Sequence, residues 1–159
     1  MLDALLSAHP ELNDETERIA CDLLAAVSVG QVATEVESAL VSIPVDALGA
    51  RAGRVRGRGY VHETEAAYEL VNEVIEPFRL DLARRTALGL LDPAAKLVVG
   101  IVAGIYRARD PEDGTVLAYA GEDTPIEIAT DVLDRAAELG VRIPDGAPSS
   151  HWPRWPDLS

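Results

Sequence analysis

Apolar residues recur at intervals of three and four along most of this chain, which is the pattern of helices with one buried face. Sustained alternation of apolar and polar residues is absent, and the nearest candidate for a strand, TVLAYAG at 115–121, is short and contains alanine. The pattern therefore predicts an all-α fold. The expected helices cover residues 15–27, 29–43, 63–76, 77–90, 93–108 and 125–139, with room for a short turn of helix after Pro44.

Capping signals mark where these helices begin. A short polar residue followed three positions later by an acid or amide occurs three times, a spacing in which both side chains cap the first turn. The pairs are Asp14 with Glu17, Ser28 with Gln31, and Thr124 with Glu127. Asp92-Pro93 predicts a fourth start, because proline at the first helical position loses no hydrogen bond. Pro77 either kinks one long helix or begins a second, and Gly140 stands where a left-handed residue ends the last helix.

The helices follow one another as three pairs with tight connections, which suits a compact bundle of hairpin pairs. The three pairs share no sequence similarity, which argues against a true repeat array. A degenerate helical-repeat stack stays open as an alternative to the bundle. Helix 93–108 is apolar nearly all round, so we expect it to be the central buried element. Gly100 and Gly104 on this helix have a spacing that lets another backbone approach closely. The predicted organisation is a helical domain over 1–142 and a tail over 143–159.

The tail contains both tryptophans of the chain, Trp152 and Trp155, together with four prolines. The prolines predict an extended path and exclude a helix. Because two exposed indoles would leave a large apolar area in water, we expect the tail to dock. Two forms of docking are expected. Either Trp152 and Trp155 fill a groove between helices of the same chain, or they bind a partner or a second copy, with WPRW as a recognition peptide.

The composition fits one globular domain of 159 residues, with 48% hydrophobic and 26% charged residues. The first residues lack the basic start and apolar core of a secretory signal. The longest apolar run, 97–106, has about half of the roughly 20 residues that a membrane span needs. We therefore expect a cytoplasmic protein without a membrane partner. The net charge of -13 disfavours nucleic acids, because a negative field repels polyanions.

Motifs for catalysis or cofactor binding are missing from the sequence. It contains no G-x-S-x-G, no P-loop, no Rossmann glycine pattern and no zinc-ligand spacing. Acidic residues on helices 63–76 and 125–139 fall opposite the apolar faces, at about 100° per residue, so we expect them to face solvent. No cofactor and no metal are expected. A weaker alternative places magnesium between Glu73, Glu76, Asp131 and Asp134.

Basic charge is concentrated in residues 49–61 of this acidic chain. The residues concerned are Arg51, Arg54, Arg56, Arg58 and the neighbouring Tyr60. Four glycines keep the stretch out of a stable helix, while guanidinium groups bind carboxylates and phosphates. Three interpretations stay open, the last the least favoured. The stretch folds back on the acidic helices, it binds an acidic protein or a small anion, or it binds nucleic acid, with Tyr60 as a stacking face.

The succession of short, capped amphipathic helices resembles the helical-hairpin modules that bind other proteins, which is a likeness of architecture. Because the sequence has no catalytic motif, we expect a non-catalytic interaction or adaptor module. Its expected partner is another protein or a second copy in a homodimer. The alternative is a small-molecule or nucleotide-handling enzyme. In that enzyme the arginine stretch binds phosphate and the helix-borne acids bind magnesium.

Overall fold

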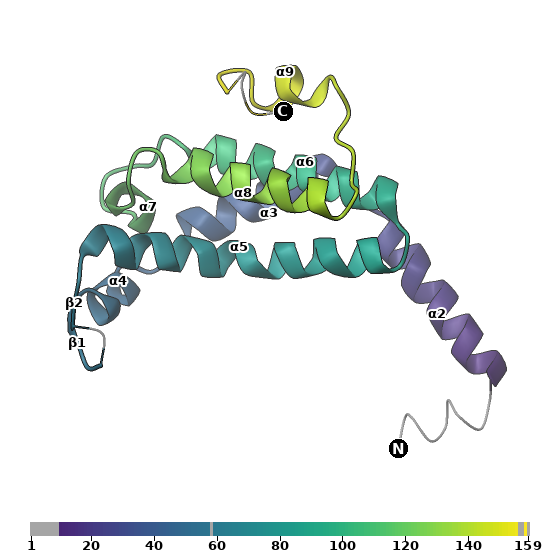
Figure 1. The fold of residues 1–159 in the computed structure, drawn as a ribbon, viewed down its shortest axis with the longest axis horizontal. Helices are drawn as coiled ribbons and strands as arrows, with labels where there is room; N and C mark the ends of the chain where they lie inside the picture. Colours follow the sequence, from purple (N-terminus) through teal and green to yellow (C-terminus); the bar gives the residue numbers. More distant parts are fainter. Residues whose placement is uncertain (1–9, 58, 156–157, 159) are drawn as a thin grey trace.

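The computed structural model describes residues 10–57, 59–155 and 158 of the chain. Within these residues the protein has eight helices and one two-stranded antiparallel sheet (Figure 1), which confirms the all-α fold class. The elements are α2 (Pro10–Ala25), α3 (Val29–Val41), α4 (Val45–Arg51), β1 (Gly53–Val55), β2 (Gly59–Val61), α5 (Glu63–Ala87), α6 (Leu91–Ala108), α7 (Val116–Tyr119), α8 (Thr124–Glu138) and α9 (Ala147–His151).

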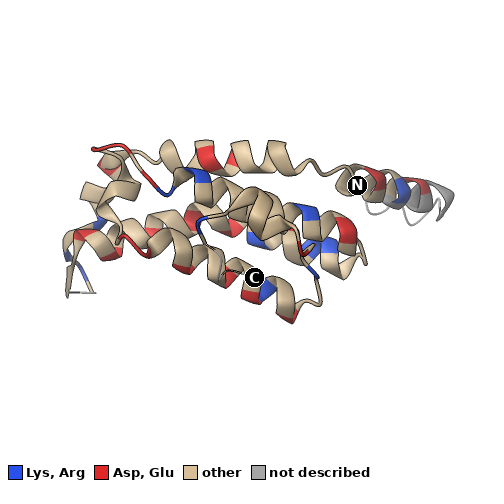
Figure 2. Ribbon diagram, turned by 90° about the horizontal axis from the view of Figure 1, so that it is seen from above, with Lys and Arg blue, Asp and Glu red and all other residues tan. Residues whose placement is uncertain are grey.

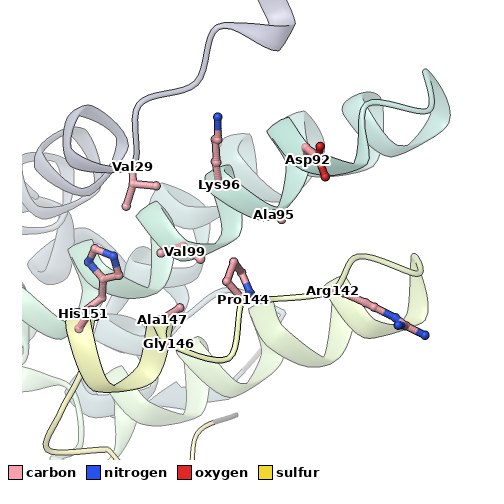
Figure 3. A pocket seen from close by; sticks show the side chains of 11 residues that line it. Val29, Asp92, Ala95, Lys96, Val99, Arg142, Pro144, Gly146, Ala147 and His151 are labelled. Atoms are coloured by element: carbon pink, nitrogen blue, oxygen red, sulfur yellow. The ribbon is translucent and has the colours of Figure 1, made fainter.

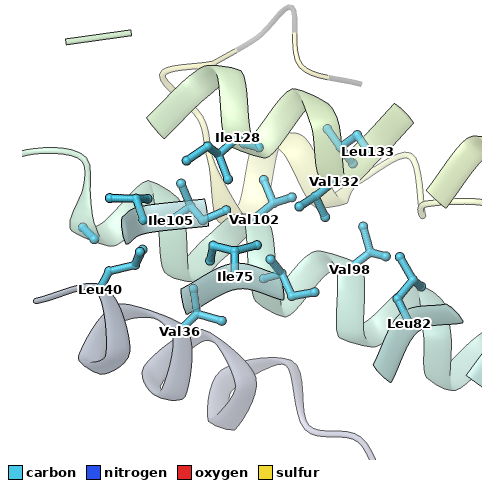
Figure 4. Packing of buried hydrophobic residues seen from close by; sticks show 14 of the residues in the cluster. Val36, Leu40, Ile75, Leu82, Val98, Val102, Ile105, Ile128, Val132 and Leu133 are labelled. Carbon is cyan, nitrogen blue, oxygen red and sulfur yellow. The ribbon is translucent and has the colours of Figure 1, made fainter. Parts of the chain in front are cut away.

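Helix α6 is the centre of the bundle, as its apolar sequence predicts. It packs against α3, α5, α8 and α9. Its side chains Val98, Val102 and Ile105 are buried. Figure 4 shows them among apolar side chains of three neighbouring helices. These neighbours are Val36 and Leu40 of α3, Ile75 and Leu82 of α5, and Ile128, Val132 and Leu133 of α8.

Two glycines allow α3 and α6 to pack closely. A Cβ atom at Gly100 would lie 2.6 Å from the Cβ of Val32. At Gly104 it would lie 2.6 Å from the Cβ of Val36 and 2.7 Å from the carbonyl oxygen of Ala33. Carbon atoms pack favourably at roughly 3.5–4.0 Å, so a side chain at either position would push the helices apart. The close approach expected from the spacing of the glycines is therefore confirmed.

Helix α5 runs without interruption from Glu63 to Ala87 and contains Pro77. Of the two alternatives that the sequence allowed at Pro77, the structure shows one long helix and not the start of a second. Pro77 is exposed, so water can reach the backbone carbonyl of residue 73, which loses its usual N–H donor. After residues 88–90 the chain turns back into α6, and the two long helices lie side by side.

Helix α2 leads away from the bundle (Figure 1). A bend of 78° separates its residues Arg18–Ala25 from α3, so α2 and α3 do not fold against each other as a hairpin. The chain is already helical at Pro10, so the start expected at Asp14 is wrong; proline is itself well suited to a first turn. At the other end, the buried guanidinium of Arg85 donates a hydrogen bond to the Leu24 carbonyl in the last turn of α2.

Other element boundaries agree with the sequence to within a few residues. Ser28 caps α3, and its hydroxyl oxygen accepts a hydrogen bond from the backbone N–H of Gln31 at 3.4 Å. Helix α8 begins one residue earlier than expected, because Asp123 stands at the cap position and Thr124 is already helical. Similarly, α6 begins at Leu91, so Asp92 lies in its first turn. Gly140 has a φ of 74°, the left-handed conformation expected after the last long helix.

Two short helices are not among those that the sequence pattern predicts. The stretch 115–121 contains the helical turn α7. The tail contains α9, so the prediction that its prolines exclude a helix is wrong. Pro148 lies in the first turn of α9, where its missing N–H removes no helical hydrogen bond.

Among the residues that the structure describes, no single helix has the length and apolar character of a membrane span. Residues Arg18–Ala25 of α2 and the whole of α3 reach that length and composition only as a pair, across the 78° bend.

Candidate functional site

Most of the arginine stretch lies in or beside a β-hairpin between α4 and α5, formed by β1 (Gly53–Val55) and β2 (Gly59–Val61), which we call the arginine hairpin. Strands β1 and β2 pair antiparallel, and Arg54 lies opposite Tyr60. Gly53, Gly57 and Gly59 have φ values of 93°, 88° and 86°, which other residues rarely adopt. The glycines thus do more than prevent a helix, because they let the chain reverse. Sequence reasoning missed the hairpin, although glycines on both sides of an Arg-Val alternation were a signal for it.

Arg51, at the base of the hairpin, is held by helix α5. Its Nη1 and Nη2 atoms each lie 2.6 Å from a carboxylate oxygen of Glu73, which makes a two-pronged ion pair. The hydrogen bonds from Arg51 lower the pKa of Glu73 below its ordinary value of 4.5. Arg51 therefore lies as expected if the stretch folds back on the acidic helices.

Arg54, Arg56 and Tyr60 extend the hairpin into solvent. Their side chains are exposed, and Tyr60 is the most exposed large hydrophobic residue in the described part of the chain, at 73%. Within the same described residues, neither Arg54 nor Arg56 has an ion-pair partner. These two arginines therefore do not fold back on the acidic helices. These side chains border an open hollow of about 640 Å³ together with Gly57 and Gly59. Arg58, the fourth predicted arginine, lies outside the described residues.

The carboxylates of the magnesium alternative are separated by arginines. Glu73 binds Arg51, as described above. Glu76 and Asp131 lie 3.7 and 3.9 Å from the half-buried guanidinium of Arg79, which stands between α5 and α8. Asp134 is exposed on α8. In the described part of the chain, no three His, Cys, Asp or Glu side chains are grouped so that they could hold a metal ion.

The tail lies on the bundle through its tryptophans. Trp152 is completely buried, and its indole N–H donates a hydrogen bond to the carbonyl of Leu158 at 3.0 Å. The ring of Trp155 meets the ring of Tyr106 edge-on, with centroids 5.0 Å apart. Arg109 covers the ring of Tyr106, with its guanidinium carbon 3.9 Å from the centroid. This arrangement corresponds to the first of the two predicted roles, a groove within the same chain.

A second hollow lies where the tail crosses α6, and we call it the tail pocket (Figure 3). Its volume is about 490 Å³, and its lining includes Val29, Ala95, Val99, Lys96, Ala147 and His151. Sequence reasoning did not find this pocket, because its walls come from three segments far apart in the chain. The one available signal was Lys96, the single lysine in the sequence.

Comparisons with protein-family models, with curated proteins and with solved structures found no match to this chain.

Proposed function

We propose that this protein is a non-catalytic interaction module that binds an acidic segment of another protein through the arginine hairpin. The observation that carries the proposal is the position of Tyr60. This aromatic side chain is 73% exposed and lies across the ladder from Arg54. Tyrosine and arginine are among the residue types enriched where proteins bind one another.

The charge distribution supports an acidic partner. The chain has 27 acidic and 14 basic residues, yet residues 51–58 contain four arginines and no acid. Figure 2 shows acidic positions recurring along the helices, and basic positions at the hairpin and also on several helices. Because Arg54 and Arg56 lack ion-pair partners among the described residues, their guanidinium groups are available to carboxylates.

The anchoring of the hairpin also supports this role. Arg51 and Glu73 tie its base to the long helix α5, so the exposed side chains project from a fixed base. A binding surface that is ordered before it meets its partner loses less conformational entropy on binding.

Fluorescence anisotropy with a short labelled peptide rich in aspartate and glutamate tests the proposal. The double variant Arg54→Ser, Arg56→Ser should bind this peptide roughly ten times more weakly than the unchanged protein, since two exposed ion pairs are lost. Tyr60→Ser should also weaken binding, and added salt should reduce the affinity of the unchanged protein.

The matched control is the double variant Arg84→Ser, Arg135→Ser, which removes two exposed arginines from α5 and α8. It has the same net charge as the hairpin variant, so a nonspecific charge effect would weaken both equally. Equal affinities of the two variants, or no binding of the peptide, would contradict the proposal. A rise in melting temperature with nucleotide and magnesium would instead support the nucleotide-handling enzyme.

A further inference from the structure

Helix α2 stands apart from the bundle with an apolar strip uncovered. Figure 1 shows it leaving the bundle at the end opposite to the arginine hairpin. Within the described residues, α2 packs lengthwise against no other helix, and Arg85 holds its last turn through the carbonyl of Leu24. Its side chains Ile19 and Leu23 are 47% and 72% exposed. Because these two residues are one helical turn apart, they lie side by side on one face, which we call the α2 strip.

Carboxylates border the α2 strip. Glu15 and Asp22 are exposed and lie on the same face of the helix as Ile19, at spacings of four and three residues. Arg18 forms ion pairs with both, but one guanidinium balances only one of the two charges, and ion pairs this exposed are weak. Over its whole length α2 has five acidic residues and one basic residue, the largest excess of acid on any described helix. The strip is therefore surrounded by negative charge.

The arginine hairpin presents the complementary groups. Arg54 and Tyr60 lie opposite each other in the ladder, so their side chains project from the same side of the hairpin. An exposed aromatic ring beside a guanidinium matches an aliphatic strip beside carboxylates, because the apolar and the charged groups then both find partners. The hairpin and α2 lie at opposite ends of the bundle (Figure 1), so contact between them requires two copies of the chain.

We propose that the arginine hairpin of one copy binds α2 of a second copy, with the ring of Tyr60 on the α2 strip and Arg54 and Arg56 beside its carboxylates. This pairing, which rests on the function proposed above, makes α2 the acidic segment that the hairpin recognises. Each copy has one hairpin and one α2, so the contact is head-to-tail and leaves one surface free at each end of a dimer. Further copies can therefore add. Because both surfaces are small, the association should be weak and reversible.

Sedimentation velocity of the full chain at increasing concentration tests the proposal. The sedimentation coefficient should rise with concentration, and it should rise less at high salt, because salt screens exposed ion pairs. Leu23→Ser should weaken the association roughly tenfold, since most of the α2 strip is lost. Leu80→Ser is the matched control, because Leu80 on α5 is 62% exposed, and this variant should associate like the unchanged protein. A coefficient that does not change with concentration, or equal effects of the two substitutions, would overturn the proposal.

Mixing two variants tests the head-to-tail geometry. The double variant Arg54→Ser, Arg56→Ser keeps α2 intact, and Leu23→Ser keeps the hairpin intact. At a concentration where neither variant associates alone, an equimolar mixture should form dimers that do not grow further, since each pair of copies has one working contact. A symmetric contact, in which both copies use the same surface, would not be restored by mixing, and that result would refute the proposal.

The labelled acidic peptide separates this self-association from the function proposed for the hairpin. The peptide should dissociate the assembly, because it competes with α2 for the same arginines. A protein that binds the peptide but stays monomeric at every concentration would refute self-association and leave the proposed function intact. Absence of both peptide binding and self-association would refute both. Self-association that persists unchanged in Arg54→Ser, Arg56→Ser would place the contact on another surface and so contradict the pairing of hairpin and α2.

Discussion

The guanidinium of Arg51 grips the carboxylate of Glu73 with two hydrogen bonds of 2.6 Å each, across 22 residues of sequence. This pair joins the end of α4 to the middle of α5. It is the described ion pair that fixes the base of the arginine hairpin.

Loss of this pair should loosen the hairpin. In Arg51→Ser, the backbone amides of β1 and β2 should exchange with solvent faster, because the ion pair no longer holds the base of the ladder. Hydrogen exchange measured by mass spectrometry or NMR tests this. Arg135→Ser, which breaks the ion pair of Arg135 with Glu138 on α8, should leave hairpin exchange unchanged. Identical hairpin protection in Arg51→Ser and the unchanged protein would show that the pair does not order the hairpin.

The same pair should make stability depend on pH in the acid range. The pKa of Glu73 is lower in the folded protein than its ordinary value of 4.5. Such a carboxyl adds stability above its unfolded pKa and loses that contribution as pH falls through its folded pKa. The stability difference between the unchanged protein and Glu73→Gln should therefore be largest at neutral pH and shrink below about pH 4.5.

Urea unfolding at neutral and acid pH measures this difference. In an Arg51→Ser background the effect of Glu73→Gln should become nearly independent of pH, because the guanidinium that lowers the pKa of Glu73 is gone. A difference that persists unchanged in that background would assign the effect to another group.

Side chains added between α3 and α6 should destabilise the bundle. Gly100→Ala and Gly104→Ala should each lower the free energy of unfolding by about 1–3 kcal/mol, the usual cost of overpacking. Gly104→Ala should be the worse, because its new methyl group meets the backbone oxygen of Ala33 at 2.7 Å as well as the side chain of Val36. Thermal or urea unfolding measures both variants.

Gly30→Ala is the matched control for these substitutions. A Cβ atom there meets no atom within 4 Å, so alanine should be neutral or stabilise by up to about 1 kcal/mol. If all three alanine variants behaved alike, the close packing of α3 on α6 would be disproved.

Removal of Trp152 should undock the tail. Trp152→Ala should lower the free energy of unfolding by about 3–5 kcal/mol, as expected for a buried tryptophan. Trp155→Ala should cost less, since Trp155 is half-buried and its contact with Tyr106 is worth about 0.5–1.5 kcal/mol beyond its buried area. Truncation after Gly146 removes both contacts and should be at least as destabilising as Trp152→Ala.

Tryptophan fluorescence tests where the tail docks. Blue-shifted emission and protection from acrylamide in dilute protein, independent of concentration, are expected for docking within one chain. Protection that appears only as concentration rises would mean that a second copy supplies the groove. Water-like emission with free quenching at every concentration would contradict docking in either form.

Local patterns were sufficient for the helical class and for several element positions. The apolar periodicity predicted the long helices, because burial of one face follows from a period of about 3.6 residues. An apolar surface on all sides predicted that 93–108 is central, since no face of it can be left in water. Ser28 and Gly140 were predicted at the ends of helices, because their roles depend on backbone groups only a few residues away.

Local sequence patterns did not predict the contacts between segments that are far apart in the chain. Arg51 and Arg54 look alike in the sequence, yet in the described residues Arg51 finds Glu73 and Arg54 finds no ion-pair partner. That difference exists only once α4, which ends at Arg51, packs against α5. The tail pocket likewise forms only where α9 crosses α6 near Val29. The helical class depends on residues that are near one another along the chain. Long-range ion pairs and pockets depend on tertiary packing, because the residues that form them are far apart in sequence and no local pattern marks them.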